Sequence, residues 1–347
     1  MRRTASTVLL LLAAACAGAG RDAVRAPAPL VWQAAHGRDH PLAGRIREVA
    51  AGRWIDEDAL LDALAVADLV LVGERHDNPD HHALQARIVA GLVARGRRPA
   101  VAFEMLDAGD APAIAGALAA PGDAAARAAA LREAVAWDAS GWPPFALYAP
   151  LFEAVLRARL PIVAANLPRS ERHAIGHGGI AALPPARRAA LGLDAPADPG
   201  ERRALAEQIR EAHCGHAPPA MLERMVDVQR AWNAQLARAL ASAAAATPDE
   251  AALLVASAAA ATPDGSALLV AGNEHVRRDR GAPRWLARFA PRAHVASVGL
   301  LEIDPDDPAA DPSAGAPFDY VWLTPRADLA DPCEKYRESL EKLRAPP

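Results

Sequence analysis

The chain has 347 residues, of which 52% are hydrophobic, and it carries a formal net charge of −4. This length allows one large or two small domains, and the apolar content is ample for a buried core. A protein that binds DNA or RNA needs a basic face to neutralise phosphates, and we find none in this sequence, so we exclude nucleic acid as a partner.

The first thirty residues have the pattern of an export signal followed by a tether. Two arginines precede the apolar run Val8–Leu12, and three alanines then lead to Cys16. The run is too short to cross a bilayer as a stable helix, and the order is typical of a secretory signal. We expect a signal peptide over 1–15, and a lipidated Cys16 with a flexible tether over 16–30. Ordinary signal cleavage beside an incidental cysteine is the alternative. The lipid would anchor the protein to the membrane of a bacterial cell envelope, at the outer membrane or the periplasmic face.

The next informative stretch is a predicted strand, loop and helix. The run Leu69–Gly73 is apolar throughout, as a strand buried on both faces requires, and Glu74 and His76 follow it. A helix should begin after Asn78, which is a good N-cap, and should end at Gly96. Ligands of open parallel sheets bind where the strands end, so a carboxylate and an imidazole stand at a candidate site.

The same pattern of apolar run and polar end recurs along the chain. Further runs of this kind are Pro99–Phe103, Pro161–Ala165 and Ala267–Ala271. Helical segments separate them, as crossovers in a parallel sheet require. The sequence therefore predicts an α/β fold in which these runs and Leu69–Gly73 are inner strands of one mostly parallel sheet with helices on both faces. His294–Ile303 and Phe318–Leu323 should extend that sheet.

Because the carboxyl ends of parallel strands meet at one edge, polar side chains from four strand ends should converge on one rim. They are Glu74, His76, Glu104, Asn166, Arg169 and His275. Two carboxylates and two imidazoles suit a divalent cation or acid–base chemistry, and the residues alone do not decide between them. Arg169 suits a carboxylate or a haem propionate, or it neutralises Glu104.

Other polar and aromatic residues near the rim have two readings each. His81 and His82 fall in the first turn of the predicted helix, where at least one should point outward, and a solvated helix start explains them as well as ligand binding does. Trp137, Trp142 and Tyr148 border a turn that packs on the scaffold or forms a stacking wall for a flat ligand.

The middle of the chain is interpreted as scaffold. Residues 218–245 have the spacing of a long helix, in which Trp232 should belong to the core. The segments 242–256 and 257–271 are near-identical copies. Since only the second copy leads into His275, we interpret 242–256 as a tandem insertion at the surface.

Two cysteines remain once Cys16 is assigned to the lipid. Cys214 and Cys333 would lie in an oxidising compartment in an exported protein, which favours a disulfide between them. Two unrelated buried cysteines are the alternative. The sequence has no CxxCH haem attachment motif and no paired CxxC zinc motif.

Read in order, the strand-end motifs resemble a known family. The segments GERHDNPDHHALQ, VAFEM, ANLPR, GNEHVRRDRGAPRWL and FDYVWLTPRADLADPCE are similar to those of the ChaN-like haem-binding lipoproteins of the Tiki, TraB and erythromycin-esterase superfamily. The likeness covers residues 50–337 and implies a single domain over 31–347. One departure is Glu274, where the family usually has a second glycine, so a further carboxylate is expected to enter the site.

The resemblance implies that haem binds at the rim through oxygen or nitrogen side chains. The candidates for iron ligation are His76, His275, Tyr148, Tyr320 and Tyr336, and Arg169 is a candidate for the propionates. The leading hypothesis is an exported lipoprotein that binds haem or iron and takes part in its uptake or handling. Whether it forms a homodimer stays open.

Hydrolases of the same superfamily imply an alternative function, a metal-dependent protease or esterase. Glu74 or Glu104 would activate a water, while His76 or His275 positions it or holds a divalent metal. The sequence has neither a GxSxG elbow nor an HExxH helix, so serine and zincin mechanisms have no support. A structural envelope lipoprotein with a vestigial rim is the third hypothesis, and whether the protein is an enzyme stays open.

Overall fold

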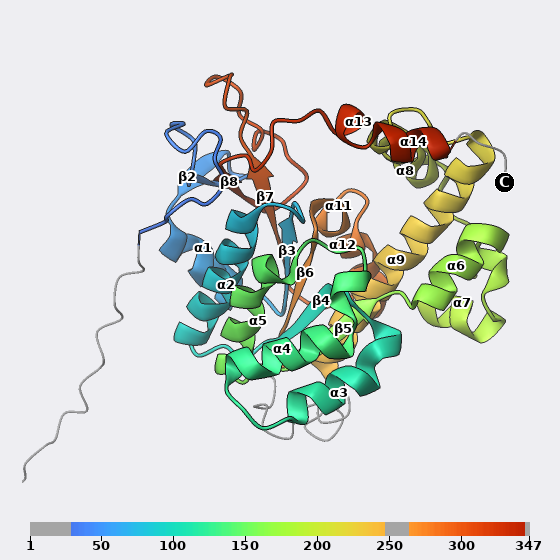
Figure 1. Cartoon of the computed structure of the whole chain (residues 1–347), viewed down its shortest axis with the longest axis horizontal. Helices are drawn as coiled ribbons and strands as arrows, with labels where there is room; N and C mark the ends of the chain where they lie inside the picture. Colours follow the sequence, from blue (N-terminus) through green and yellow to red (C-terminus); the bar gives the residue numbers. More distant parts are fainter. Residues whose placement is uncertain (1–28, 247–263, 344–347) are drawn as a thin grey trace, which may run out of the picture. The chain divides into compact units, whose positions relative to one another are not determined.

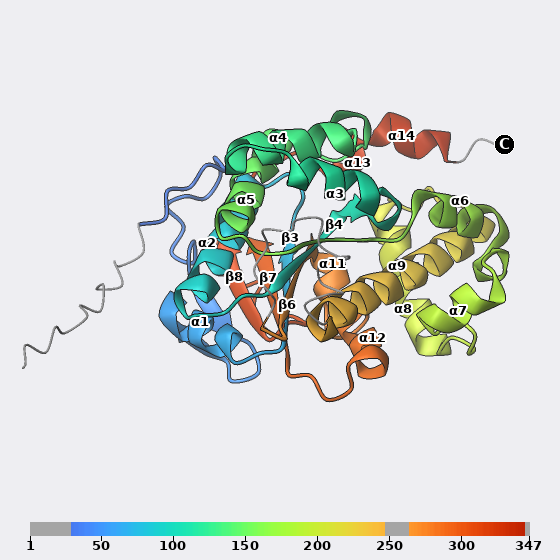
Figure 2. The ribbon, with the colours of Figure 1, turned by 90° about the horizontal axis from the view of Figure 1, so that it is seen from below.

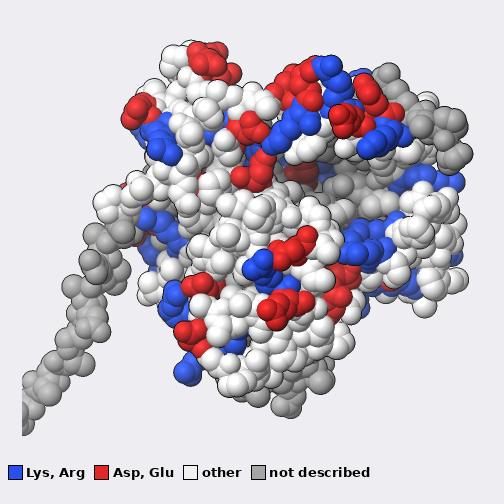
Figure 3. Space-filling view, in the orientation of Figure 1, with Lys and Arg blue, Asp and Glu red and all other residues white. Residues whose placement is uncertain are grey.

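The structure is a computed structural model that describes residues 29–246 and 264–343 (Figure 1). The predicted signal peptide, Cys16 and nearly all of the tether lie outside the described residues, as does most of the repeated segment. Within the described ranges, no helix combines the length and the apolar character needed to cross a membrane. Acidic and basic side chains are interspersed on the face drawn in Figure 3, in keeping with the small net charge.

In the described part of the chain, eight strands form one sheet in the order β2-β1-β8-β7-β3-β6-β4-β5. Their bounds are β1 Ile46–Glu48, β2 Arg53–Ile55, β3 Leu69–Glu74, β4 Ala100–Asp107, β5 Ile162–Asn166, β6 Ala267–Gly272, β7 Val295–Glu302 and β8 Tyr320–Thr324. Strands β3 to β8 pair in parallel. The β1–β2 hairpin, which we did not predict, adds antiparallel to β8.

The predicted single, mostly parallel sheet is confirmed, with one correction. Strand β5 was expected inside the sheet, but it lies at the end of the strand order beside β4 alone. Its side chains are still largely buried, because helix α9 (Pro219–Ala245) packs against it. The apolar run therefore predicted correctly that the faces of the strand are buried, but it could not show whether a further strand pairs with its outer edge.

Helices cover both faces of the sheet, as predicted (Figure 2). Side chains alternate along each strand, so Leu69 and Leu71 share a core with Leu236 of α9. On the other face, Phe103 of β4 stacks on Phe152 of helix α5 (Phe145–Arg157) with ring centroids 4.4 Å apart. This alternation decides which face each strand-end side chain reaches.

The remaining helices are α1 Glu57–Ala65, α2 Pro79–Ala94, α3 Ala111–Ala119, α4 Ala124–Ala134, α6 Arg169–Gly178, α7 Pro185–Leu191, α8 Pro199–Ala212, α11 Asn273–Val276, α12 Ala282–Phe289, α13 Pro332–Lys335 and α14 Arg337–Lys342. Three-residue 3-10 helices are η1 Ala108–Asp110, η2 Trp137–Ala139 and η3 Ile180–Ala182. Helix α9 ends inside the first copy of the repeat, and the second copy leads into β6 as expected.

The strand, loop and helix predicted around the first rim residues are confirmed. Asn78 caps α2 by accepting a hydrogen bond from the backbone N of Asp80 at 2.9 Å. After the helix, Gly96 takes a φ of 80°, in the left-handed region that glycine tolerates best. The cap residue thus sets the start of α2 directly beside the end of β3.

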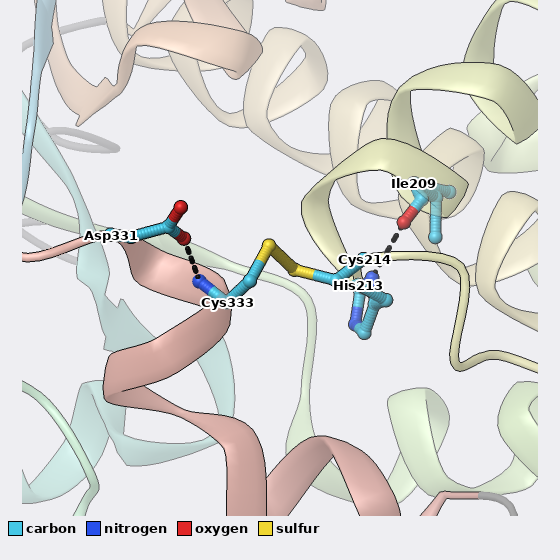
Figure 4. Close-up of a disulfide and its surroundings, with 5 residues drawn as sticks. All are labelled: Ile209, His213, Cys214, Asp331 and Cys333. Carbon is cyan, nitrogen blue, oxygen red and sulfur yellow. Dashed lines mark hydrogen bonds between the residues drawn. A yellow bond between two sulfur atoms is a disulfide. The ribbon is translucent and has the colours of Figure 1, made fainter.

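A disulfide joins Cys214, in the turn after α8, to Cys333 of α13 (Figure 4). Their Cα atoms lie 5.9 Å apart, inside the range of roughly 4.4–6.8 Å that a bridge needs. The predicted pairing is therefore confirmed. Beyond the bridge, Lys335 Nζ lies 3.6 Å from Asp77 Oδ2, in the loop between β3 and α2. The C-terminal segment thus contacts both the α8–α9 turn and the loop that carries His76.

Candidate functional site

Glu74 is the last residue of β3 and is 2% exposed. Its Oε1 accepts hydrogen bonds from His76 Nδ1 and from the Tyr148 hydroxyl, each at 2.7 Å. Its Oε2 accepts one from Gln85 Nε2 at 2.7 Å and lies 3.2 Å from His82 Nδ1. The strand pleat turns Glu74 toward α2 and α5, which supply Gln85, His82 and Tyr148, while His76 comes from the loop after β3. Both carboxylate oxygens are thus fully engaged.

The contacts around the buried Glu74 carboxylate shift its pKa and the pKa values of the side chains that bind it. Burial raises the pKa of Glu74, but the charge of His82 and the hydrogen bonds from His76 and His82 outweigh it, and the pKa ends well below its usual value. Burial lowers the pKa of His76, but its hydrogen bond to Glu74 and the charges of Glu104 and Glu74 raise it to about 9. Burial and the Glu74 charge raise the pKa of Tyr148. Burial lowers the pKa of His82, but the charge of Glu74 and the hydrogen bond to it raise that pKa above its usual value. At neutral pH the cluster therefore includes the Glu74 anion, the His76 cation and a neutral Tyr148 phenol.

A second carboxylate–imidazole pair comes from the other face of the sheet. Glu104 lies within β4 and is 1% exposed; its Oε2 accepts a hydrogen bond from the backbone N of Gly272 at 2.7 Å. Its Oε1 lies 3.3 Å from His275 Nε2, and His275 Nδ1 lies 2.7 Å from Asn233 Oδ1 of α9. Burial raises the pKa of Glu104, but the charge and hydrogen bond of His275 lower it by more, so the pKa ends below its usual value. Both ring nitrogens of His275 face an acceptor oxygen.

The two pairs meet at Gly272, the last residue of the central strand β6. Gly272 is in register with Glu74, and β6 lies between β3 and β4. A Cβ at Gly272 would lie 3.0 Å from His76 Nε2 and 3.6 Å from Glu104 Oε2. Only a residue without a side chain leaves room for both groups, and around it the structure brings the four predicted residues Glu74, His76, Glu104 and His275 together.

The four residues are paired with one another and do not form a ready metal centre. Within residues 29–246 and 264–343, no three His, Cys, Asp or Glu side chains are arranged to hold a metal ion. A divalent metal at the predicted set would therefore require the carboxylate–imidazole contacts to open.

A cavity of about 230 Å³ lies beside the pairs. Two tryptophans in its wall connect it to the imidazoles: the Trp142 ring lies 5.0 Å from that of His76, and the Trp232 ring lies 5.1 Å from that of His275. Its other lining residues are Met105, Asp107, Asp110, Val135, Trp137, Ser140, Gly141, Asn166, Arg169 and Arg172. The predicted residues Asn166 and Arg169 thus line this cavity and do not contact the carboxylates.

Arg169 does not neutralise Glu104, which was one of its predicted roles. Among the described residues, none accepts a hydrogen bond from its guanidinium or forms an ion pair with it, whereas its backbone N donates to Asp107 Oδ2 at 2.7 Å. That backbone contact fixes the start of α6 at the cavity wall and leaves the guanidinium available to a ligand.

The expectation that His81 or His82 points outward is wrong, since both are completely buried. The backbone N of Arg75 donates to His81 Nδ1 at 2.7 Å, and His81 Nε2 contacts the Thr324 hydroxyl at 2.9 Å. Burial and the charge of His82 lower the pKa of His81 to about 3, so it is neutral. The first turn of α2 packs beneath the loop that follows β3, which a solvated helix start would not do.

Among the described residues, Tyr320, Tyr336 and Glu274 make no hydrogen bond or ion pair with Glu74, His76, Glu104 or His275. Tyr320 begins β8 and so stands at the opposite edge of the parallel strands, and Tyr336 is 52% exposed on the C-terminal segment. Glu274, predicted to add a carboxylate to the site, instead pairs with Arg280 Nη2 at 2.7 Å. Trp137 is 1% exposed and packs on Phe145, which agrees with the prediction that it belongs to the scaffold.

Three residues of the site were missed by sequence reasoning. Gln85 and Asn233 orient the two pairs, and Trp232, which we interpreted as core, borders the cavity. A signal for the last two was present: with Gln229 they are spaced three and four residues apart, which places them on one helix face. Nothing in the sequence showed that this face meets the strand ends.

Comparisons with known proteins agree with this architecture. A family model described as haem-binding uptake, Tiki superfamily, ChaN matches residues 60–286. The structure of ChaN of Campylobacter jejuni, reported with cofacial haem binding, is similar with a TM-score of 0.57 and 22% identity over 80% of this chain and 95% of that one. It supports the fold.

Two further solved structures are less similar. The type III effector HopBA1 has a TM-score of 0.38 at 13% identity, over 77% of this chain and 92% of its own. A Bacillus cereus protein has a TM-score of 0.29 at 12% identity, over 71% of this chain and 68% of its own. No protein with a curated description matches the sequence. Because the family model spans well over half of the chain, the protein belongs to the ChaN family of haem-binding uptake proteins in the Tiki superfamily.

Proposed function

We propose that the protein binds haem at the strand-end site and takes part in haem or iron uptake from a lipid-anchored position in the cell envelope. The observation that carries the proposal is the state of His76. Its Nδ1 donates to Glu74, and among the described residues its Nε2 has no hydrogen-bond partner, while 34% of the side chain is exposed. Histidines that ligate metals usually donate their other ring nitrogen to a carboxylate in this way.

The surrounding residues fit a tetrapyrrole. Haem would supply an iron centre with an open position for a nitrogen or oxygen ligand. Trp142 packs against His76 and presents an aromatic surface, and the unpaired Arg169 guanidinium suits a propionate. His76 carries a proton at neutral pH, because its pKa is raised to about 9, so Nε2 must release that proton to bind iron.

The other predicted ligands have less support. Both ring nitrogens of His275 are engaged, by Glu104 and Asn233. The Tyr148 hydroxyl is buried and donates to Glu74. We therefore assign iron ligation to His76 and the propionate contact to Arg169.

No observation favours the alternative hydrolase. A general base needs a pKa near the working pH, whereas the pKa values of Glu74 and Glu104 are lowered. Both carboxylates also accept hydrogen bonds that a water-activating base would have to give up. The envelope location, for its part, is supported by the signal pattern and by Cys16.

Haemin titration of the soluble chain from residue 17 tests the proposal. We expect a shifted Soret band, and His76→Ala should weaken affinity by at least about tenfold, or 1.4 kcal/mol. His177→Ala is the matched control, since His177 is an exposed histidine on α6. Absence of binding by the unaltered chain would overturn haem binding, and equal affinity of the His76 and His177 variants would overturn the assigned ligand.

A further inference from the structure

The cavity beside the carboxylate–imidazole pairs has two buried polar atoms in its wall that lack partners. Asn166 is 2% exposed, and its Oδ1 has no hydrogen-bond partner. Trp232 Nε1, buried in the same wall, also has none. A buried polar group without a partner typically costs about 1–3 kcal/mol. Both residues line the cavity, so a polar group bound there would supply partners that the described residues do not.

Three side chains that line the cavity can donate hydrogen bonds without losing a bond that they already make. The Arg169 guanidinium is unpaired among the described residues, and the Trp232 indole can only donate. No described residue hydrogen-bonds the Asn166 amide, so a half-turn of the amide presents its Nδ2 donor in place of Oδ1. Strand β5 and helices α6 and α9 thus each contribute one hydrogen-bond donor to the residues that line the cavity.

The remaining charged and hydroxyl groups of the wall are largely committed. Asp107 accepts from the backbone N of Arg169 and of Gly109, and Ser140 donates to the Trp137 carbonyl. Arg172 donates to the Leu167 carbonyl and lies over the Trp232 ring. Asp110 has no ion pair with Arg169, and burial and the charge of Asp107 raise the pKa of Asp110 while the charge of Arg169 lowers it.

We infer that this cavity is a carboxylate subsite, in which Arg169, Trp232 Nε1–H and the Asn166 amide hold one propionate of a porphyrin. The inference rests on the proposed function and deepens it. The cavity takes the arm of the ligand, because Arg169 lies in its wall, and the ring lies against Trp142, on the side of His76.

Metal-free porphyrins test the subsite separately from iron ligation. Protoporphyrin IX keeps both carboxylates, and its dimethyl ester has none. Binding of each to the soluble chain is measured by quenching of tryptophan fluorescence. We expect the unaltered chain to prefer the free acid by at least about tenfold. Equal binding of acid and ester, or binding of neither, would overturn the inference.

Two variants locate the preference in the cavity. Trp232→Phe keeps an aromatic ring and removes the N–H, and Arg169→Gln removes the charge; each should reduce the preference to about threefold or less. Trp54→Phe, in the β1–β2 hairpin, is the matched control and should keep the full preference. Arg169 lies at the cavity wall and outside the core, so its variant stays informative if Trp232→Phe unfolds. An unchanged preference in Arg169→Gln would overturn the assignment.

Failure of the subsite and failure of haem ligation give different results. Because the metal-free probe has no iron, the preference of the unaltered chain for the free acid is measured without any contribution from iron ligation. Haemin binding without a preference for the free acid would refute the subsite and keep the proposed function. A preference for the free acid without haemin binding would keep the subsite and refute the proposed function.

Discussion

The Glu74–His76 and Glu104–His275 pairs use the same two functional groups at neighbouring strand ends, yet they differ in what is left over. In the first pair the carboxylate is saturated by four side chains, and the imidazole keeps one nitrogen without a partner. In the second pair the imidazole is held at both nitrogens, and its carboxylate has a backbone and a side-chain partner. A strand-end imidazole is thus available to a ligand only when its neighbours leave a nitrogen exposed.

The difference follows from the pleat of the sheet. Glu74 turns toward α2 and α5, whose Gln85 and Tyr148 hold the carboxylate while His76 lies on a loop. Glu104 belongs to the alternate set of side chains that faces α9, and Asn233 of that helix holds His275. One pair therefore presents its imidazole outward, and the other uses it to join α9 to the strand ends.

Removing either buried carboxylate should have the largest effect on stability, and the loss should differ between the two pairs. Glu74→Gln removes the buried counter-ion of the His76 cation and the carboxylate partner of His82, so the free energy of unfolding should fall by about 3–5 kcal/mol. Glu104→Gln should cost less, because a glutamine oxygen still accepts from the backbone N of Gly272. Urea unfolding of both variants measures this, and equal losses would show that the two carboxylates are equivalent.

Opening the disulfide should have the next largest effect. Replacing Cys214 and Cys333 by serine should lower unfolding free energy by about 2–4 kcal/mol, because the bridge closes a long loop in the unfolded chain. It should also loosen the side of His76 more, since Lys335 reaches Asp77 there. Amide exchange at Asn78 should therefore accelerate while that at Gly272 stays slow. Equal acceleration at both amides would contradict this asymmetry, and a reductant should not affect the double variant.

A smaller effect is expected in the pH dependence of stability, and it comes from the proton on His76. The pKa of His76 is raised from 6.5 to about 9 in the folded chain. Its proton therefore stabilises the fold fully below pH 6.5, and this contribution is lost as pH rises through about 9. The effect is small because a third of the side chain is exposed to solvent screening.

Urea midpoints measured between pH 6 and pH 10 test this. The raised pKa of His82 adds a contribution of the same sign, so His76→Gln should flatten the profile only in part. A profile that is identical in the variant would show that the proton is not held at His76.

Much of the framework could be predicted because it depends on local patterns. Apolar runs closed by polar residues marked all six parallel strands, and Asn78 and Gly96 marked the ends of α2. Parallel strands end at one edge, so the convergence of Glu74, His76, Glu104 and His275 followed from the order of elements along the chain.

The edge position of β5, the burial of His81 and His82, and the contributions of Gln85 and Asn233 did not follow from the sequence. Each depends on which helix face packs on which strand end, and residues far apart in the chain set that packing. His81 lies beneath a loop and contacts Thr324 of β8.

By itself, then, the sequence determined the family, the parallel sheet and the set of acid and imidazole groups at its rim, because period, caps and strand ends are local properties. Only the tertiary structure decided which imidazole keeps a nitrogen for a ligand and that Asn166, Arg169 and Trp232 enclose a cavity. Hydrogen-bond saturation depends on distances and directions between elements, and those arise only when the helices pack on the two faces of the sheet.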